Sequence, residues 1–393
     1  MKKLLFVFGT RPEAVKMCPL VAECRRRKGL QSYVCVTGQH RDMLDRVLES
    51  FRVTPDFDLH IMKEKQTLFD ITASVLARLR AVLDGVQPDL VLVHGDTTTS
   101  FAAALAGFYR QIPVAHVEAG LRTYRTDSPY PEEFNRQAVG SISSYHFAPT
   151  GTAAQNLIRE GKDPARIFVT GNTVVDAMRW TVRPDFSHPA LDWAAGGKLI
   201  LLTAHRRENL GEPMRRMFRA IRRVLSEHDD CRLVYPVHRN PAVRQIAEEE
   251  LGGCERVLLI EPLDVIACHN LEARCHLALT DSGGLQEECP GFGKPVLVLR
   301  DTTERPEGIA AGTLRLTGTE EAGVYRAFTE LLEDPTAYAR MARASNPYGD
   351  GLACERIADV LEFGRCSAWT GGEGAGASIP FSLPDQGVSP RKD

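Results

Sequence analysis

Short runs of apolar residues recur along the whole chain. Each run is continuous rather than alternating, as in strands that are buried on both faces of a parallel sheet. Between most runs the apolar residues follow a helical period, as in 71–83 and 214–225. The pattern predicts repeated strand–helix–strand units. The expected strands are residues 4–8, 33–36, 90–93, 114–117, 167–169, 199–202, 233–235, 257–260, 277–279 and 296–299.

The expected strands fall into two groups. Residues 179–198 between them are rich in Pro, Asp and Gly with weak periodicity, so we place a domain junction there. The length of 393 residues also favours two domains. We assign residues 1–172 to a first α/β domain, joined by a C-terminal helix at 350–365, and residues 173–349 to a second. The Gly-, Ser- and Pro-rich residues 366–393 predict a disordered tail.

Composition excludes several classes of protein. Hydrophobic residues make up 43% and charged residues 25%, and the formal net charge is −3, so a nucleic-acid partner is not expected. The ten cysteines show no C-x-x-C pair, which indicates reduced and mostly buried thiols. The apolar run after Met1-Lys2-Lys3 is too short for a signal peptide or a membrane span. We therefore expect a cytoplasmic protein without a membrane partner.

Unusual polar residues gather just past the ends of the expected strands. In open parallel sheets this edge binds ligands, because loops and helix N-termini converge there. The polar clusters are residues 9–13, 39–40, 94–96, 118–120, 171–172, 205–208, 238, 281–284 and 300–305.

Two of these loops suit a diphosphate. In the first turn, Arg11 could make a two-pronged contact and Lys16 could act as a point charge, although a plain turn with surface cations is the alternative. The turn at Ser282, Gly283 and Gly284 presents backbone N–H groups at the start of a helix, where an anion is favoured. The first turn lacks both G-x-G-x-x-G and the P-loop motif, so neither of those nucleotide sites is supported.

Three acids are candidates for general acid/base chemistry. Asp96 ends the strand at 90–93, where capping of the next helix is the alternative role. Glu118 follows the next strand, and Glu132 lies in a proline-stiffened loop; each could instead be solvated or structural. Acids that share one cleft acquire separate pKa values, which acid/base catalysis at neutral pH requires.

Two further loops carry candidate residues. His205 could protonate or hydrogen-bond a leaving phosphate oxygen, or be structural. The charged loop at 301–307, which contains Arg305, is either an ion-paired corner or a clamp for phosphate and sugar. The sequence contains no H-E-x-x-H or G-x-S-x-G motif, so neither a metal centre nor a serine hydrolase is expected.

Many collinear motifs resemble the non-hydrolysing UDP-N-acetylglucosamine 2-epimerases. They include FGTRPEAVKMCPL, VTGQHRDML, VLVHGDTTTSFAAALA, HVEAGLRT, SPYPEEFNRQ, LLTAHRRENLGEP, LTDSGGLQEE and GKPVLVLRDTTERPEG, and they extend to about Phe363. The resemblance implies two Rossmann-like domains of glycosyltransferase-B type facing a central cleft, with the catalytic carboxylates in 1–172 and most UDP contacts in 173–349. It also implies a homodimer, no cofactor, UDP-N-acetylglucosamine and UDP as ligands, and a product that supplies bacterial surface polysaccharide.

The resemblance can be carried over position by position. It assigns uracil and diphosphate recognition to the Ser282 turn and ribose contact to Glu288. It assigns catalysis and further contacts with phosphate and sugar to Asp96, Glu118, Glu132, His205, Arg11, Lys16 and Arg305. Bacterial members are described as binding a second substrate molecule as an allosteric activator, and the positions that match that site are Gln39, Gln66, Arg206 and His238. Asp42 and Lys65 depart from the Gln and Arg expected there, and an acid near a diphosphate would repel it.

The implied reaction is the reversible epimerisation of UDP-N-acetylglucosamine at carbon 2. Carbon 2 has no adjacent carbonyl, so direct removal of its proton is prohibitive. Departure of UDP from carbon 1 acidifies that proton and gives a 2-acetamidoglucal, to which UDP adds back with a proton on the opposite face. Three alternatives stay open: a hydrolysing epimerase, a glycosyltransferase of the same fold, and a nucleotide-sugar sensor without catalysis.

Overall fold

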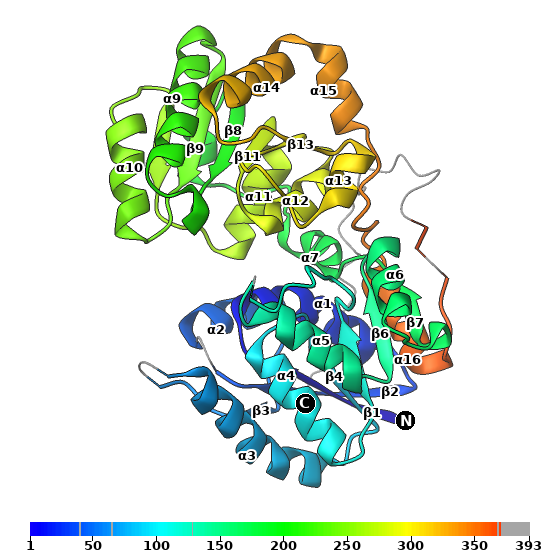
Figure 1. The fold of residues 1–393 in the computed structure, drawn as a ribbon. Coiled ribbons are helices and arrows are strands. Elements are labelled where there is room, and N and C mark those ends of the chain that lie inside the picture. The colour runs from blue at the N-terminus through cyan, green and yellow to red at the C-terminus, as the bar shows by residue number, and fades with distance from the viewer. Residues whose placement is uncertain (39–40, 64–65, 128, 368, 371–393) are drawn as a thin grey trace. The chain divides into compact units, whose positions relative to one another are not determined.

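The computed structural model describes residues 1–38, 41–63, 66–127, 129–367 and 369–370. These residues form two compact units. Unit 1 contains Met1–Ala177, Glu304–Ala311 and the described residues from Ser345 onward, and unit 2 contains Met178–Thr303 and Gly312–Ala344. Each unit is built around its own parallel sheet, and Figure 1 labels their elements.

Unit 1 holds a seven-stranded sheet in the order β3-β2-β1-β4-β5-β6-β7. Every neighbouring pair is parallel, with Phe6 of β1 opposite Val34 of β2 and Leu92 of β4. The strands are β1 (Lys2–Phe8), β2 (Leu30–Val36), β3 (Phe57–Asp58), β4 (Leu90–His94), β5 (Val114–Val117), β6 (Tyr145–Ala148) and β7 (Ile167–Val169).

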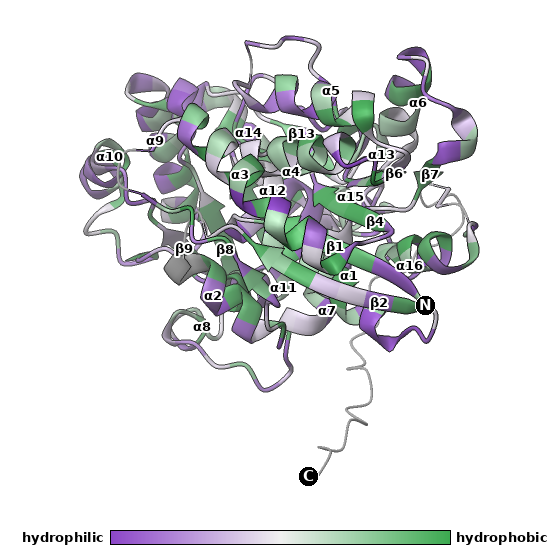
Figure 2. Ribbon diagram, turned by 90° about the horizontal axis from the view of Figure 1, so that it is seen from below, coloured by the Kyte–Doolittle hydropathy of each residue, from purple (hydrophilic) through white to green (hydrophobic). Residues whose placement is uncertain are grey.

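Helices cover both faces of this sheet, as Figure 1 shows. Leu5 and Val7 of β1 pack in one core with residues of α3 and α4, and the alternate residues Leu4 and Phe6 of the same strand are also fully buried. Burial on both faces explains the continuous apolar runs; Figure 2 accordingly colours β1 and β4 mainly as hydrophobic. The helices are α1 (Arg11–Arg26), α2 (Arg41–Ser50), α3 (Leu68–Val86), α4 (Thr98–Tyr109), α5 (Glu132–Ile142), α6 (Gly151–Arg159), α7 (Thr173–Thr181), α13 (Pro306–Ala311) and α16 (Ala353–Phe363), with the short 3₁₀ helix η1 (Pro164–Arg166).

Unit 2 repeats the plan with six parallel strands in the order β10-β9-β8-β11-β12-β13. Its core joins Ile200 and Leu202 of β8 to Phe218 and Ile221 of α9. The strands are β8 (Lys198–Thr203), β9 (Cys231–Pro236), β10 (Val257–Ile260), β11 (Leu277–Thr280), β12 (Val296–Val298) and β13 (Leu314–Leu316). The helices are α8 (Pro189–Trp193), η2 (Arg207–Asn209), α9 (Glu212–Glu227), α10 (Pro241–Leu251), α11 (Val265–Arg274), α12 (Gly283–Glu288), η3 (Cys289–Phe292), α14 (Glu321–Glu333) and α15 (Pro335–Ala342).

The C-terminal helix α16 belongs to unit 1. It packs against α1, and Asp176 of α7 accepts hydrogen bonds from its first backbone N–H groups, those of Ala353 (3.1 Å) and Cys354 (2.7 Å). Burial raises the pKa of Asp176 to about 6 despite these bonds. An acid at a helix N-terminus satisfies N–H groups that have no intrahelical acceptor.

The division of the chain differs in two places from the boundaries expected from composition. Unit 1 ends at Ala177, inside α7, and the Pro- and Gly-rich residues 179–198 contain the short helix α8. Residues 304–311 cluster with unit 1, because Tyr348 accepts a hydrogen bond from the N–H of Gly308 (3.1 Å) and Glu307 accepts one from Thr150 (3.0 Å). Within the described part of the chain, no helix is long and apolar enough to cross a membrane.

Candidate active site

The strand order of each unit marks the place where a ligand is expected. In unit 1 the order reverses between β1 and β4, and in unit 2 between β8 and β11. Ligands of open parallel sheets bind outside the carboxyl ends of the strands at such a switch point. Four of the predicted polar clusters follow these four strands.

The turn from β1 into α1 is held by the buried Glu13. Its Oε2 accepts hydrogen bonds from the N–H groups of Gly9 (3.0 Å) and Thr10 (2.8 Å), and its Oε1 accepts one from the Thr97 hydroxyl (2.7 Å). Glu13 therefore ties this turn to the loop after β4. On the first turn of α1, Arg11 has no acidic partner among the described residues, so its charge is available to a ligand.

Glu118 directly follows β5 and is buried beside a cation. Its φ of 62° lies in the left-handed region, which is uncommon for a residue with a side chain and marks a position held by its surroundings. Lys16 pairs with its carboxylate, Asn172 Nδ2 donates to it at 3.0 Å, and His94 Nε2 lies 3.7 Å away. Burial raises the pKa of Glu118, but Lys16, with smaller contributions from His94 and Arg136, outweighs burial and holds that pKa well below its ordinary value. Glu118 is therefore ionised at neutral pH.

The two histidines on these strands differ in their hydrogen bonding. Burial lowers the pKa of His94, and its Nε2 has no hydrogen-bond partner in the described part of the protein. A buried polar atom of this kind is costly unless a ligand satisfies it. His116, in contrast, shares a 2.7 Å hydrogen bond with the carbonyl oxygen of Gly95, and burial lowers its pKa to about 3, which indicates a structural role.

Helix α5 positions Asp96 and Glu132. Arg136 forms an ion pair with the Asp96 carboxylate, and Asn135 Nδ2 donates to the Asp96 carbonyl oxygen at 2.9 Å. Glu132 begins the same helix, one turn before these two residues, and is half-buried. The adjacent Glu133 is fully buried and accepts hydrogen bonds from two backbone N–H groups of the preceding loop (2.9 and 3.1 Å), so it is structural.

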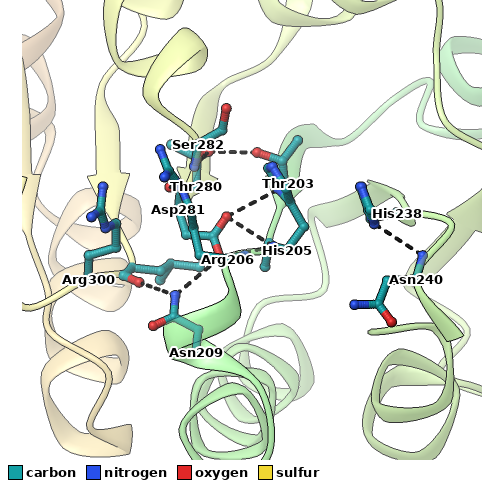
Figure 3. Close-up of polar contacts among 12 residues, drawn as sticks. Thr203, His205, Arg206, Asn209, His238, Asn240, Thr280, Asp281, Ser282 and Arg300 are labelled. Atoms are coloured by element: carbon teal, nitrogen blue, oxygen red, sulfur yellow. Dashed lines mark hydrogen bonds and ion pairs between the residues drawn. The ribbon is translucent and has the colours of Figure 1, made fainter. Parts of the chain in front are cut away.

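In unit 2, Asp281 joins the loops that follow β8 and β11, as Figure 3 shows. Its carboxylate accepts hydrogen bonds from the N–H groups of His205 (2.9 Å) and Arg206 (2.9 Å) and from Asn209 Nδ2 (3.1 Å). Burial raises the pKa of Asp281, but hydrogen bonds from His205 and Arg206 outweigh burial and lower that pKa below its ordinary value. Asp281 thus fixes the backbone on which His205 is carried.

The turn after β11 leads directly into α12. Ser282 is its N-cap, yet the Ser282 side chain makes no capping hydrogen bond, and the first N–H groups of a helix have no intrahelical acceptor. Gly283 and Gly284 form the first turn. A Cβ at Gly284 would lie 3.3 Å from Glu288 Oε1, so the Glu288 carboxylate lies beside Gly284 in the first turn of α12. The structure therefore brings together the predicted anion-binding turn and the predicted ribose acceptor.

The residues matched to an allosteric site are distributed over both units. In unit 2 the rings of His205 and His238 stack with centroids 5.2 Å apart, and burial lowers the pKa of His238. Arg206 Nε donates to the Asp281 carbonyl oxygen at 3.2 Å. In unit 1, Gln66 accepts a hydrogen bond from a nearby backbone N–H at 3.3 Å. Gln39, Lys65 and the Asp42 side chain lie outside the described residues.

Arg305 belongs to unit 1, although the sequence assigned its loop to the second domain. Tyr348 donates a hydrogen bond to the Arg305 carbonyl oxygen at 3.2 Å, and Glu304 lies 3.7 Å from the guanidinium. The loop is thus partly an ion-paired corner, one of its two predicted roles.

Sequence reasoning missed two residues that hold the candidate acids. Arg136 pairs with Asp96 from 40 residues along the chain, and Asn172 contacts Glu118 from 54 residues away. Asn172 follows β7 in a polar cluster, which was the available signal, whereas Arg136 lies inside a helix and gave none.

One group of described side chains could share a cation. His269, Glu272 and Glu288 each place one ligand atom within 4.8 Å of the others. They lie on α11 and α12 without the spacing of a metal motif, and the sequence predicted no metal centre.

The chain is similar to known proteins over most of its length. The family model described as UDP-N-acetylglucosamine 2-epimerase matches residues 22–362. The UDP-N-acetylglucosamine 2-epimerase of Bacillus subtilis (strain 168) is 60% identical over 361 residues, which cover 92% of this chain and 95% of that protein.

Two solved structures share the fold. The S. aureus MnaA-UDP co-structure has 50% identity and a TM-score of 0.85, with 92% of this chain and 96% of that chain covered. The UDP-GlcNAc 2-epimerase of Neisseria meningitidis bound to UDP-GlcNAc has 46% identity and a TM-score of 0.84, with coverages of 91% and 99%.

Together with the two parallel sheets, these similarities confirm the expected α/β class with two Rossmann-like domains of glycosyltransferase-B type. The family predicted from the sequence motifs is confirmed as well. The chain therefore belongs to the UDP-N-acetylglucosamine 2-epimerase family.

Proposed function

We propose that this protein is a non-hydrolysing epimerase that interconverts UDP-N-acetylglucosamine and UDP-N-acetylmannosamine. Membership of the family supports this activity, as do the UDP-GlcNAc bound to the Neisseria meningitidis relative and the UDP bound to the S. aureus relative. The observation that carries the proposal is the buried, ionised Glu118 beside the loop of Asp96. A Cβ at Gly95 would lie only 3.5 Å from Glu118 Oε1, so the two acids come from adjacent loops.

We propose that the reaction proceeds by elimination and re-addition of UDP. The proton at carbon 2 is removed as the bond from carbon 1 to UDP breaks, because positive charge at carbon 1 acidifies that proton. The products are UDP and 2-acetamidoglucal. Addition of UDP to the glucal, with protonation on the opposite face of carbon 2, gives the epimer. Retention of UDP and the glucal between the two steps separates an epimerase from an eliminase.

The residues of unit 2 would bind UDP. Ser282, Gly283 and Gly284 offer the diphosphate a hydroxyl and backbone N–H groups at a helix start. Glu288 would accept the ribose hydroxyls, and His205 would hydrogen-bond or protonate the leaving phosphate oxygen.

The residues of unit 1 would act on the sugar and add phosphate contacts. Asp96, Glu118 and Glu132 are the candidate acids and bases. Glu118 is a weak base while Lys16 neutralises it, because a low pKa means low basicity. A diphosphate that drew Lys16 away would raise the basicity of Glu118, so substrate binding itself would activate this acid. Arg11 and Arg305 would contribute further positive charge at the phosphates.

The family resemblance also implies an oligomeric state, a use for the product and a second substrate-binding site. We propose a homodimer whose product supplies bacterial surface polysaccharide. We also propose activation by a second substrate molecule at Arg206, His238, Gln66 and Gln39, which the negative charge of Asp42 would weaken by repelling the diphosphate.

The decisive experiment is incubation with UDP-N-acetylglucosamine alone in deuterated water, followed by proton NMR. We expect UDP-N-acetylmannosamine that carries deuterium at carbon 2. Unlabelled epimer would exclude proton exchange at carbon 2. UDP with free N-acetylmannosamine would instead identify a hydrolysing enzyme, and absence of turnover without an added acceptor would favour a glycosyltransferase.

A further inference from the structure

Behind the Ser282 turn, two glutamates face each other inside unit 2. Glu272 of α11 is fully buried, and Glu288 ends α12 with its side chain 14% exposed. Their carboxyl oxygens and a ring nitrogen of His269 lie within 4.8 Å of one another. Two carboxylates at this separation in a buried site cannot both remain ionised unless a cation joins them.

The surroundings of Glu272 favour the protonated acid. Its Oε1 accepts a hydrogen bond from Cys268 Sγ at 3.1 Å, whereas its Oε2 receives none from the described part of the chain. Burial, the charge of Glu288 and a hydrogen bond with Glu288 raise the pKa of Glu272 well above its ordinary value. In a carboxyl group that lies close to a second carboxylate, an oxygen that accepts no hydrogen bond is the natural position for the proton.

The two oxygens of Glu288 have different neighbours. Oε1 lies beside the first turn of α12, 3.3 Å from where a Cβ of Gly284 would be. Oε2 lies 3.9 Å from His269 Nε2, whose ring shares a 2.7 Å hydrogen bond with Thr181 through Nδ1. Glu288 therefore has one oxygen toward the anion-binding turn and one toward the interior.

We propose that Glu272 is a positioning residue for nucleotide recognition. It retains its proton and donates a hydrogen bond to the Glu288 carboxylate, which holds Glu288 in the orientation in which it would accept hydrogen bonds from the ribose hydroxyls. This inference rests on the proposed function, because it assigns the ribose to Glu288. A carboxylate held by a buried donor loses little rotational freedom when ligand binds, so its hydrogen bonds to the diol are stronger. The single negative charge of the pair also stays on the residue that meets the ligand.

The test compares Glu272→Gln, which keeps an N–H donor, with Glu272→Leu, which keeps the volume and removes the donor. Calorimetric titration with UDP should give a dissociation constant about tenfold higher for Glu272→Leu and within about threefold of the unsubstituted protein for Glu272→Gln, as expected for one hydrogen bond to a charged group. In turnover assays Glu272→Leu should raise KM for UDP-N-acetylglucosamine more than it lowers kcat. Thermal melting of both variants identifies any loss of folding.

A second ligand separates positioning from general damage to unit 2. The diphosphate of 2′,3′-dideoxyuridine lacks the ribose diol, so it should bind the unsubstituted protein and Glu272→Leu with equal affinity. Equal weakening of both ligands by Glu272→Leu would overturn the proposal, as would equal loss of UDP affinity in the Gln and Leu variants. Metal analysis of the purified protein provides the other refutation: a stoichiometric divalent ion lost in Glu272→Gln would mean that a cation, not a proton, joins the acids. These binding assays do not depend on epimerisation, so failure of the proposed activity would remain distinguishable.

Discussion

Each unit has an aspartate followed by a hydroxyl residue just after one of its central strands, β4 in unit 1 and β11 in unit 2. The two aspartate–hydroxyl pairs have different environments. In unit 1, Asp96 and Thr97 follow β4; the Asp96 carboxylate is partly exposed and pairs with Arg136. In unit 2, Asp281 and Ser282 follow β11, and Asp281 is fully buried with three N–H groups on its carboxylate.

The hydroxyl residues differ in the opposite sense. Thr97 accepts a hydrogen bond from the N–H of Ser100 at 3.0 Å and donates to Glu13, so its side chain is committed to the fold. Ser282 caps α12 without a side-chain hydrogen bond. In unit 1, therefore, the acid is partly exposed and ion-paired, and the hydroxyl is hydrogen-bonded within the fold. In unit 2 the acid is buried and hydrogen-bonded within the fold, and the hydroxyl makes no capping bond. This contrast matches an acid/base role for one unit and anion binding for the other.

The largest expected effect is that of Asp96→Asn. If Asp96 acts as an acid or base, turnover of UDP-N-acetylglucosamine should fall roughly 100- to 10,000-fold. Unfolding free energy should change by less than about 1 kcal/mol, because a partly exposed ion pair contributes little. NMR assays and thermal melting test both parts. Asp84→Asn, which breaks an exposed pair with Arg110 in the same unit, is the matched control and should keep normal turnover. More than a tenth of normal turnover in Asp96→Asn would remove this acid from the mechanism.

Removal of the corresponding carboxylate in unit 2 should destabilise the fold instead. Asp281→Ala leaves the buried N–H groups of His205 and Arg206 and the Asn209 amide without their acceptor, at a cost of about 1–3 kcal/mol for each unsatisfied group. Urea unfolding should show a loss of about 3–5 kcal/mol. Asp301→Ala, on the exposed loop after β12, should leave stability unchanged. If Asp281→Ala kept the stability of the unsubstituted protein, Asp281 would not be a structural residue, and the contrast with Asp96 would fail.

The sequence predicted most of the fold because its central strands are long and buried on both faces. It missed β3, β6 and β13, which have two, four and three residues and too few apolar positions to form a recognisable run. It located the polar loops that follow the strands for a similar reason, since polar residues after buried strands are easily recognised.

What the sequence could not distinguish was the role of similar acids. Glu132 and Glu133 are adjacent, and only the folded chain brings two loop N–H groups to Glu133. Asp96 and Asp281 likewise occur in comparable motifs, and their difference arises from partners that are distant in sequence. The predicted site residues are therefore located by the fold, while their chemical roles stay predictions until the variants are measured.

A third prediction concerns pH and the Lys16–Glu118 pair. Lys16 holds the folded-state pKa of Glu118 below its unfolded value, so the pair contributes stability above about pH 4.5 that is lost as the pH falls toward the folded pKa. Glu118→Gln should therefore be less stable than the unsubstituted protein at pH 7, by a difference that shrinks below about pH 4.5. The Glu118 carboxylate partly offsets the lowering of the His94 pKa by burial, so Glu118→Gln also changes the titration of His94, which contributes to the stability difference at low pH.

The double variant Lys16→Met/Glu118→Gln separates loss of the pair from the cost of an unpaired buried Lys16. It should recover part of the stability lost by Glu118→Gln at neutral pH. A stability difference that stays constant from pH 7 to about pH 3 would show that Glu118 is not held ionised by Lys16.

The smallest effects should come from substitution of the two hydroxyl residues, Thr97 and Ser282. These variants test whether each hydroxyl serves the stability of the fold or the binding of UDP. Thr97→Ala removes a capping acceptor from α4 and should lower the free energy of unfolding by about 1 kcal/mol, with no change in the dissociation constant for UDP. Ser282→Ala removes no capping bond, so stability should change by less than about 0.5 kcal/mol. The dissociation constant for UDP should nevertheless rise about tenfold, as expected when a hydrogen bond to a charged phosphate is lost. If Ser282→Ala instead lost stability and kept its affinity for UDP, the hydroxyl residue would stabilise the fold in both units. Anion binding by the Ser282 turn would then depend on its backbone N–H groups alone.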